Sequence, residues 1–124
     1  MKQGEIWLIN LDPTIGAEIK KTRPAIIVND NSLGKLPLKI IVPLTDWKER
    51  YEIAPWMVKI KPDNISNLPK ESAVDCFQIR SLSEERFVKK IGRISSNSLD
   101  EIKDALSKVL TIEKIGRASC RERV

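Results

Sequence analysis

Short apolar runs, separated by turn-forming residues, dominate the chain up to about residue 95. Runs of this length, with alternating or continuous apolar positions, are typical of β-strands. The pattern predicts strands over 4–11, 24–30, 38–45, 56–62, 72–80 and 87–94. The first is largely apolar, which indicates a strand buried on both faces. Pro24 stands at the first position of the second strand, and we expect the third to end near Pro43.

The apolar period changes after residue 95. Residues 98–110 place Leu99, Ile102, Leu106, Val109 and Leu110 at helical spacing. Ser98 and Glu101 match a capping box at the start of this helix. Short helical turns are expected within the charged segment 45–56 and after Ser83. Several short strands and one terminal helix predict a small, strongly bent sheet or partial barrel.

Length and composition favour one soluble domain. The chain has 124 residues, 41% hydrophobic and 31% charged. The apolar runs are too short to span a membrane, and the N-terminus does not resemble a signal peptide, so we expect a cytoplasmic protein. Residues 111–124 lose the apolar period and shift to Arg, Ser and Cys. We therefore expect a domain over 1–110 and a vector-derived or run-on tail over 111–124.

Histidine is absent from the chain, which removes the usual acid–base group and the commonest zinc ligand. The two cysteines, Cys76 and Cys120, cannot form a metal quartet, and no structural disulfide is expected. We expect no metal and no cofactor. The net charge of +5 is compatible with an anionic partner, but the tail contributes +2 of it.

A basic run, Lys20, Lys21 and Arg23, precedes the second predicted strand. Paired lysines of this kind usually lie in a solvated loop. Arg23 differs, because Pro24 restricts its backbone to an extended shape. An arginine held at the end of a strand can present its planar fork of donors to a phosphate.

Other polar residues lie where predicted strands end. Thr45 is either a turn cap or a hydroxyl donor beside a phosphate. Gln78 and Arg80 alternate with apolar neighbours, which predicts one polar face of a strand, either solvated or part of a site. Asp75 is a carboxylate for such a site or a partner for an arginine. Three aromatic residues belong to the core or a dimer surface, or stack on bases: Trp47, Tyr51 and Trp56.

Taken in order, these motifs resemble the MazF/PemK family of toxin endoribonucleases over roughly residues 2–110. The resemblance is carried by the glycine–aromatic start, the D-P-x-x-G-x-E turn, T-R-P at 22–24 and Q-I-R at 78–80. It implies a mainly β protein with a C-terminal helix, an SH3-like small β-barrel of the MazF/PemK/CcdB type. It also implies a homodimer that cleaves single-stranded RNA without a metal, as an mRNA interferase, and an antitoxin that blocks the RNA groove.

The resemblance assigns roles to individual residues. Arg23 and Thr45 match the catalytic pair of well-understood relatives. Gln78 and Arg80 match a motif near the site and, with the basic loop residues Lys20 and Lys21, are the expected RNA-binding residues. Some members carry a histidine where this chain has Ala17, and an acidic residue where it has Phe77, so their division of acid and base does not transfer. Glu18, Asp75, a backbone carbonyl or water are all open as the acceptor of the 2′-proton.

Two other functions share this fold. A toxin that poisons DNA gyrase by protein contact would not need Arg23 with Thr45. An inactive paralogue would bind only RNA or antitoxin.

Overall fold

The computed structural model describes residues 1–11, 22–33 and 35–112. Its regular elements, in chain order, are β1 (Glu5–Asn10), β2 (Thr22–Ile27), β3 (Leu38–Asp46), β4 (Met57–Ile60), β5 (Ser72–Asp75), β6 (Arg80–Ser83), β7 (Phe87–Arg93) and α1 (Ser96–Val109). Four short 3₁₀ helices accompany them: η1 (Asn31–Leu33), η2 (Glu49–Ile53), η3 (Cys76–Gln78) and η4 (Glu84–Arg86). In this described part, no helix is long and apolar enough to cross a membrane.

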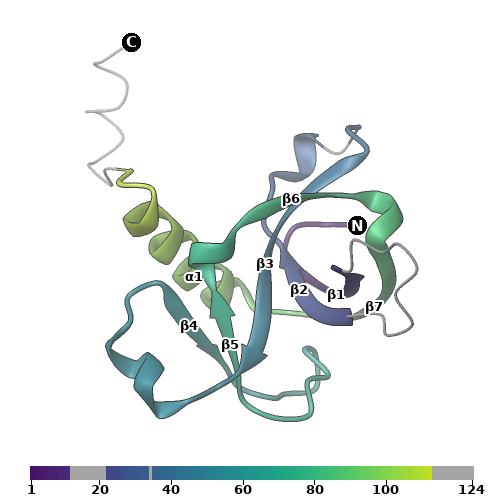
Figure 1. The fold of residues 1–124 in the computed structure, drawn as a ribbon. Helices are drawn as coiled ribbons and strands as arrows, with labels where there is room; N and C mark the ends of the chain where they lie inside the picture. The colour runs from purple at the N-terminus through teal and green to yellow at the C-terminus, as the bar shows by residue number, and fades with distance from the viewer. Residues whose placement is uncertain (12–21, 34, 113–124) are drawn as a thin grey trace.

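The strands form one bent antiparallel sheet in the order β4-β5-β3-β2-β1-β7, with β6 beside the first half of β3. Figure 1 shows β1, β2, β3, β6 and β7 curling round on one side, while β4, β5 and α1 lie on the other. The pairings found among the described residues do not close the sheet into a barrel, and β4 and β7 are its two ends. The prediction of a mainly β chain with a C-terminal helix is confirmed.

Each face of the sheet has its own apolar core. The first core lies against α1 and includes Ile6, Ile26, Val42, Leu44, Val74 and Ile102. The second lies inside the curl and consists of Ile9, Ala25, Ile27, Ile41 and Leu82, with Trp7, Leu11 and Phe87 packed against it. Successive side chains of a strand point to opposite faces, so one strand supplies both cores. The prediction that the first strand is buried on both faces is confirmed, since Ile6 and Ile9 enter different cores.

The second strand begins and ends earlier than predicted, and the third is longer than predicted. β2 begins at Thr22, so Pro24 is its third residue, and Arg23 pairs with Ile9 of β1. β3 continues through Pro43 to Asp46. On one side β3 pairs first with β6, over Leu38–Ile41, and then with β5, over Leu44–Asp46. Pro43 lies in the gap between these two ladders, which suits a residue that has no backbone N–H to donate.

The predicted strand over 72–80 is wrong beyond Asp75. The chain forms η3 at residues 76–78, and β6 begins only at Arg80. The Asp75 side chain caps this turn by accepting a hydrogen bond from the Phe77 N–H. A 3₁₀ helix does not alternate its side chains as a strand does. The predicted common polar face of Gln78 and Arg80 is therefore also wrong.

The C-terminal helix is confirmed, but its predicted cap is not. α1 begins at Ser96, and its N-cap is Ser95, whose Oγ accepts a hydrogen bond of 3.2 Å from the Ser98 N–H. The helix starts before Ser98, so Ser98 and Glu101 cannot form the capping box. Ile102 is buried in the first core, whereas Leu110 follows the helix and is 53% exposed. The predicted short turns near residue 50 and after Ser83 are confirmed as η2 and η4.

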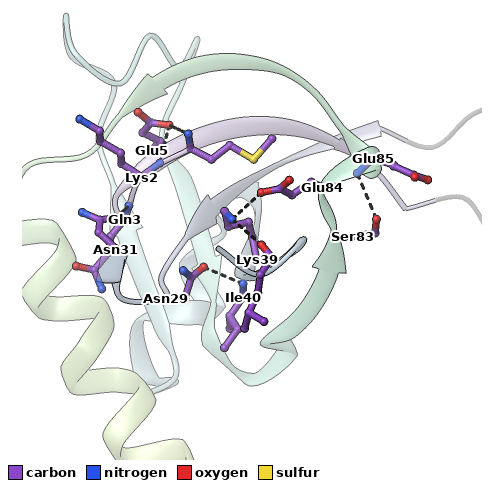
Figure 2. Close-up of polar contacts among 12 residues, drawn as sticks. Lys2, Gln3, Glu5, Asn29, Asn31, Lys39, Ile40, Ser83, Glu84 and Glu85 are labelled. Carbon is purple, nitrogen blue, oxygen red and sulfur yellow. Dashed lines mark hydrogen bonds and ion pairs between the residues drawn. The ribbon is translucent and has the colours of Figure 1, made fainter. Parts of the chain in front are cut away.

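Polar contacts link the start of β3 to neighbouring segments of the chain (Figure 2). The Lys39 side chain is only 2% exposed, and its Nζ lies 2.7 Å from Glu84 Oε2. The Asn29 Oδ1 accepts a hydrogen bond of 3.0 Å from the Ile40 N–H. The Asn31 Oδ1 likewise accepts one of 2.7 Å from the Gln3 N–H. A buried charge is tolerated only when it is paired, so Lys39 and Glu84 hold β3 and η4 together.

Gly92 of β7 allows the loop between β4 and β5 to approach the sheet. A Cβ at this position would lie 2.5 Å from the carbonyl oxygens of both Ile65 and Ser66. Backbone atoms this close cannot move aside without shifting the loop. The Arg93 N–H also donates a hydrogen bond of 2.9 Å to the Ile65 carbonyl. The loop is therefore fixed against β7.

Glu5 is the most strongly perturbed carboxylate that the structure describes. Its side chain is 13% exposed, and its Oε2 lies 3.1 Å from Lys90 Nζ. Its Oε1 accepts hydrogen bonds of 2.9 Å from Trp7 Nε1 and 3.0 Å from the Lys2 N–H. Partial burial alone would raise the pKa of Glu5, but the bonds from Trp7 and Lys2 and the charge of Lys90 lower this pKa from 4.5 to about 2.

Glu5→Gln should remove part of the pH dependence of stability. The folded pKa lies below the unfolded one, so ionised Glu5 stabilises the fold above about pH 4.5, and this contribution disappears as the pH falls toward 2. A shift of that size corresponds to roughly 3 kcal/mol. In urea unfolding between about pH 5 and pH 2.5, the wild type should lose unfolding free energy more steeply than the variant. Glu52→Gln, at an exposed carboxyl, should keep the wild-type slope, and equal slopes for all three proteins would contradict the role of Glu5.

Candidate active site

A cavity of about 220 Å³ opens where β2, β3 and β5 come together. It is lined by Arg23, Pro43, Leu44, Thr45, Tyr51, Asp75 and Gln78. The ladder between β2 and β3 pairs Ile27 with Ile41 and Ala25 with Pro43. Continuing this register by two residues brings Arg23 opposite Thr45. Both then lie on the face of the second core, where its apolar side chains end.

The same reasoning places Asp75. β3 and β5 pair Leu44 with Val74. The next residues in this register are Pro43 and Asp75, both of which line the cavity. η3 then turns the chain so that Gln78 returns to the cavity wall. The site is therefore assembled by strand register rather than by neighbouring positions in the sequence.

A second cavity, of about 290 Å³, shares Arg23, Leu44 and Thr45 with the first. Its other walls come from the loop before β5 and the ends of β2 and β3: Thr22, Pro24, Asp46, Leu68, Pro69, Lys70 and Ser72. The Lys70 Nζ lies 3.1 Å from Asp46 Oδ2 at its rim. Arg23 and Thr45 thus stand between two hollows. An extended chain could occupy both and place one linkage at the residues between them.

The donors of the site are available to a ligand. Arg23 is exposed and Thr45 is half-buried. Within the described ranges, neither side chain makes a hydrogen bond or an ion pair with another residue. Arginine carries five N–H donors in a planar fork, and threonine adds a hydroxyl. Donors of this number and charge match the oxygens of a phosphate group.

Tyr51 closes one wall of the first cavity. The Tyr51 ring packs edge to face on Trp47, with 5.8 Å between the ring centroids. The Arg50 guanidinium lies 5.4 Å from the centroid of the Tyr51 ring. Lys59 in turn lies 5.0 Å from the Trp47 centroid. These contacts hold η2 beside β3 and fix the aromatic wall next to Thr45.

The thiol of Cys76, next to Asp75 in the chain, is unreactive at neutral pH. Cys76 is fully buried in the first core. Burial, with a smaller contribution from the neighbouring Asp75 charge, raises the pKa of its thiol to about 12. A thiol with this pKa stays protonated at neutral pH, and the thiolate is the reactive form. Cys76 therefore has a packing role.

A larger cavity, of about 710 Å³, lies between β4 and α1 on the other side of the sheet. Its walls carry four carboxylates, those of Asp63, Asp100, Glu101 and Asp104, against the two amines of Lys59 and Lys61. The surplus of negative charge opposes a phosphate. For an anionic ligand, the smaller cavities at Arg23 are the better site.

Four of the residues predicted for the site share the first cavity: Arg23, Thr45, Asp75 and Gln78. Arg80 is exposed at the start of β6 and lines neither of the two cavities at Arg23. Lys20, Lys21 and Glu18 lie outside the described residues. The sequence patterns predict no role at a phosphate for Tyr51 or Lys70. Tyr51 reaches the site through the packing of η2 beside the end of β3, and Lys70 through the pairing of β5 with β3.

In the described ranges, no three His, Cys, Asp or Glu side chains are grouped so that they could hold a metal ion. The positive charge that lines the two small cavities comes from Arg23 and Lys70.

Comparison with known proteins places this chain in a family. The family model described as PemK-like, MazF-like toxin of type II toxin-antitoxin system matches residues 2–110. Endoribonuclease PemK of Escherichia coli is 32% identical over 113 residues, which cover 90% of this chain and 83% of that protein. Endoribonuclease MazF9 of Mycobacterium tuberculosis is 30% identical over 112 residues, which cover 86% of this chain and 92% of that protein.

Solved structures share the fold. A mycobacterial endoribonuclease in complex with its cognate antitoxin has a TM-score of 0.74 at 18% identity, covering 93% of this chain and 99% of that one. MazF in the MazE–MazF crystal structure (Form-III) from Deinococcus radiodurans has a TM-score of 0.72 at 22% identity, covering 91% and 98%. The MazF-like fold that the sequence motifs implied is thereby confirmed. The chain belongs to the PemK-like, MazF-like toxins of type II toxin–antitoxin systems.

Proposed function

We propose that the chain, an endoribonuclease toxin of its family, cleaves single-stranded RNA at short preferred sequences without a metal ion, as an mRNA interferase. The observation that carries the proposal is the meeting of Arg23 and Thr45 in one cavity. Their donors are engaged by no described residue and match a phosphodiester. The names of the similar proteins from Escherichia coli and Mycobacterium tuberculosis agree with this activity.

In the proposed reaction the 2′-hydroxyl attacks the neighbouring phosphorus. The O2′–P bond forms as the P–O5′ bond breaks, and the leaving O5′ takes a proton from water. The products are a 2′,3′-cyclic phosphate and a 5′-hydroxyl. Arg23 stabilises the charge that builds on the phosphorane, and Thr45 donates to a non-bridging oxygen. Arginine is always protonated, so its role is electrostatic.

The sequence offers four candidates for the group that accepts the 2′-proton: Glu18, Asp75, a backbone carbonyl or water. Asp75 lines the same cavity as Arg23. Glu18 lies outside the described residues. A gyrase poison has no comparable support, because it would not need Arg23 and Thr45 in one cavity. Cleavage of RNA by the wild-type protein distinguishes the enzyme from an inactive paralogue that only binds RNA or antitoxin.

The proposed partners are single-stranded RNA, a second copy of the chain and a cognate antitoxin, all in the cytoplasm. Two of the similar structures are complexes with an antitoxin, which supports a partner of that class here. β4 ends the sheet and pairs with no further strand among the described residues, which supports self-association, because sheet edges gain by being covered.

Arg23→Ala should abolish cleavage and leave the fold intact. An exposed charge contributes about 0–1 kcal/mol to stability. One preorganised donor at a developing charge is worth about 3–4 kcal/mol, or 100- to 1,000-fold in rate. Arg23→Lys should also cleave poorly, because a point charge lacks the planar fork. Single-turnover cleavage of a long RNA in EDTA, with circular dichroism to check the fold, measures both variants.

Arg93→Ala is the matched control, since it removes an exposed arginine from β7 without touching either small cavity. It should retain nearly the wild-type rate. A folded Arg23→Ala protein that cuts at the wild-type rate would overturn the proposed mechanism.

The proposed chemistry predicts which substrates are cut. Single-stranded RNA should be cleaved, whereas DNA lacks the nucleophile and A-form duplex RNA disfavours in-line attack. A strand with one 2′-deoxynucleotide on the 5′ side of the mapped cut should bind and resist cleavage. Gel analysis of these strands tests this, and cleavage of the deoxy strand at the normal rate would show that water, not the 2′-hydroxyl, attacks.

The protein should sediment as a homodimer at micromolar concentration, with about twice the 14.1 kDa mass of one chain. Analytical ultracentrifugation over a dilution series measures this, and a monomer throughout the series would contradict it.

A further inference from the structure

Asp75 and Gln78 stand at the two ends of η3, and hydrogen bonds tie them together. Gln78 Nε2 donates to Asp75 Oδ2 at 2.7 Å. The Phe77 N–H donates to Asp75 Oδ1 at 3.1 Å. Each carboxylate oxygen thus already accepts a bond from η3, and both side chains line the cavity of Arg23 and Thr45.

The carboxylate fixes which way the Gln78 amide faces. An ionised carboxylate only accepts hydrogen bonds, whereas an amide has a donating nitrogen and an accepting oxygen. The nitrogen of Gln78 must therefore face Asp75. Its Oε1 is turned away from the carboxylate and accepts no hydrogen bond from a described residue, and Gln78 lines the cavity. Donating a hydrogen bond to a charged acceptor also polarises the amide and strengthens Oε1 as an acceptor.

The accepting oxygen of Gln78 suits a different group of the substrate from the donors of Arg23 and Thr45. Arg23 and Thr45 supply donors, which suit the phosphate oxygens, and an amide oxygen would repel them. It suits a donor group on the nucleotide instead. The donor nearest to a phosphate that is being cleaved is the 2′-hydroxyl, and the other source is a base N–H.

We propose that Asp75 is a positioning residue that holds the Gln78 amide with its oxygen toward the cavity, where it accepts a hydrogen bond from the attacking 2′-hydroxyl. This inference rests on the proposed ribonuclease activity. Asp75 then acts through Gln78, and Gln78 orients the nucleophile without taking its proton.

The test compares four variants on an RNA whose cut has been mapped. Gln78→Leu should lower kcat about tenfold and change KM less than threefold, because the lost bond aligns the nucleophile. Asp75→Asn keeps the cap of η3, since asparagine caps as well as aspartate. It leaves the amide free to flip and should lower kcat severalfold. The double variant Asp75→Asn/Gln78→Glu restores a hydrogen-bonded pair in the reverse direction, with the donor at 75 and the acceptor at 78. It should exceed Asp75→Asn in kcat, whereas Gln78→Glu alone, with two facing carboxylates, should not.

Binding of the uncleavable 2′-deoxy strand separates the two sources of the donor. If Gln78 contacts the 2′-hydroxyl, that contact is already missing, so Gln78→Leu should leave the Kd of the deoxy strand within twofold of the wild-type value. A Kd weakened about tenfold would assign the contact to a base and overturn the inference.

Two other results also overturn it. Wild-type kcat in Asp75→Asn would show that the carboxylate does not act through Gln78. A large loss in Asp75→Asn, with Gln78→Leu near wild type and no rescue in the double variant, would make Asp75 the proton acceptor. A wild-type protein that leaves RNA intact would overturn the proposed function itself, and the inference with it, so the two failures are distinct.

Discussion

The register of the ladder between β2 and β3 decides which side chains of these strands line the candidate site. Ala25 pairs with Pro43, and two residues beyond this pair on each strand, Arg23 and Thr45 line one cavity. The side chains before them on this face, Ala25, Ile27 and Ile41, are buried in the second core. A slip of one residue would move every side chain of β2 to the opposite face. The core that fixes this register therefore also fixes the pair at its end.

The gap at Pro43, between the ladders that β6 and β5 form on one side of β3, brings in the other residues of the site. β5 and β6 pair with the same side of β3, and η3 joins them across the gap. The turn carries Gln78 to the cavity wall, and its cap, Asp75, is the next residue of the ladder with β5. Charge then distinguishes this site from the larger groove between β4 and α1, where carboxylates outnumber amines. Packing of the core positions the residues that line the small cavities, and the positive charge of Arg23 and Lys70 favours an anionic ligand there.

Sequence patterns predicted the elements better than their ends. Apolar periodicity located six of the strands and α1, because burial imposes it over many residues. It failed at residues 76–80, where the Asp75 side chain caps a turn that local alternation does not show. It also misplaced the start of α1, since Ser95 and Ser98 offer equivalent caps. Arg23 and Thr45 could be named from their motifs, but their meeting depends on pairing between distant segments. Lys70 reaches the site through the pairing of β5 with β3, and Tyr51 through the packing of η2 on Trp47.

The proposed cleavage requires a phosphodiester bound between Arg23 and Thr45. The most direct test is a crystal structure of the protein with an RNA made uncleavable by one 2′-deoxynucleotide at the mapped cut. We expect the protected phosphate to lie in the cavity of about 220 Å³, within hydrogen-bond distance of the Arg23 guanidinium and the Thr45 hydroxyl. A bound strand whose protected phosphate lies elsewhere, with Arg23 and Thr45 in contact with no phosphate, would contradict it.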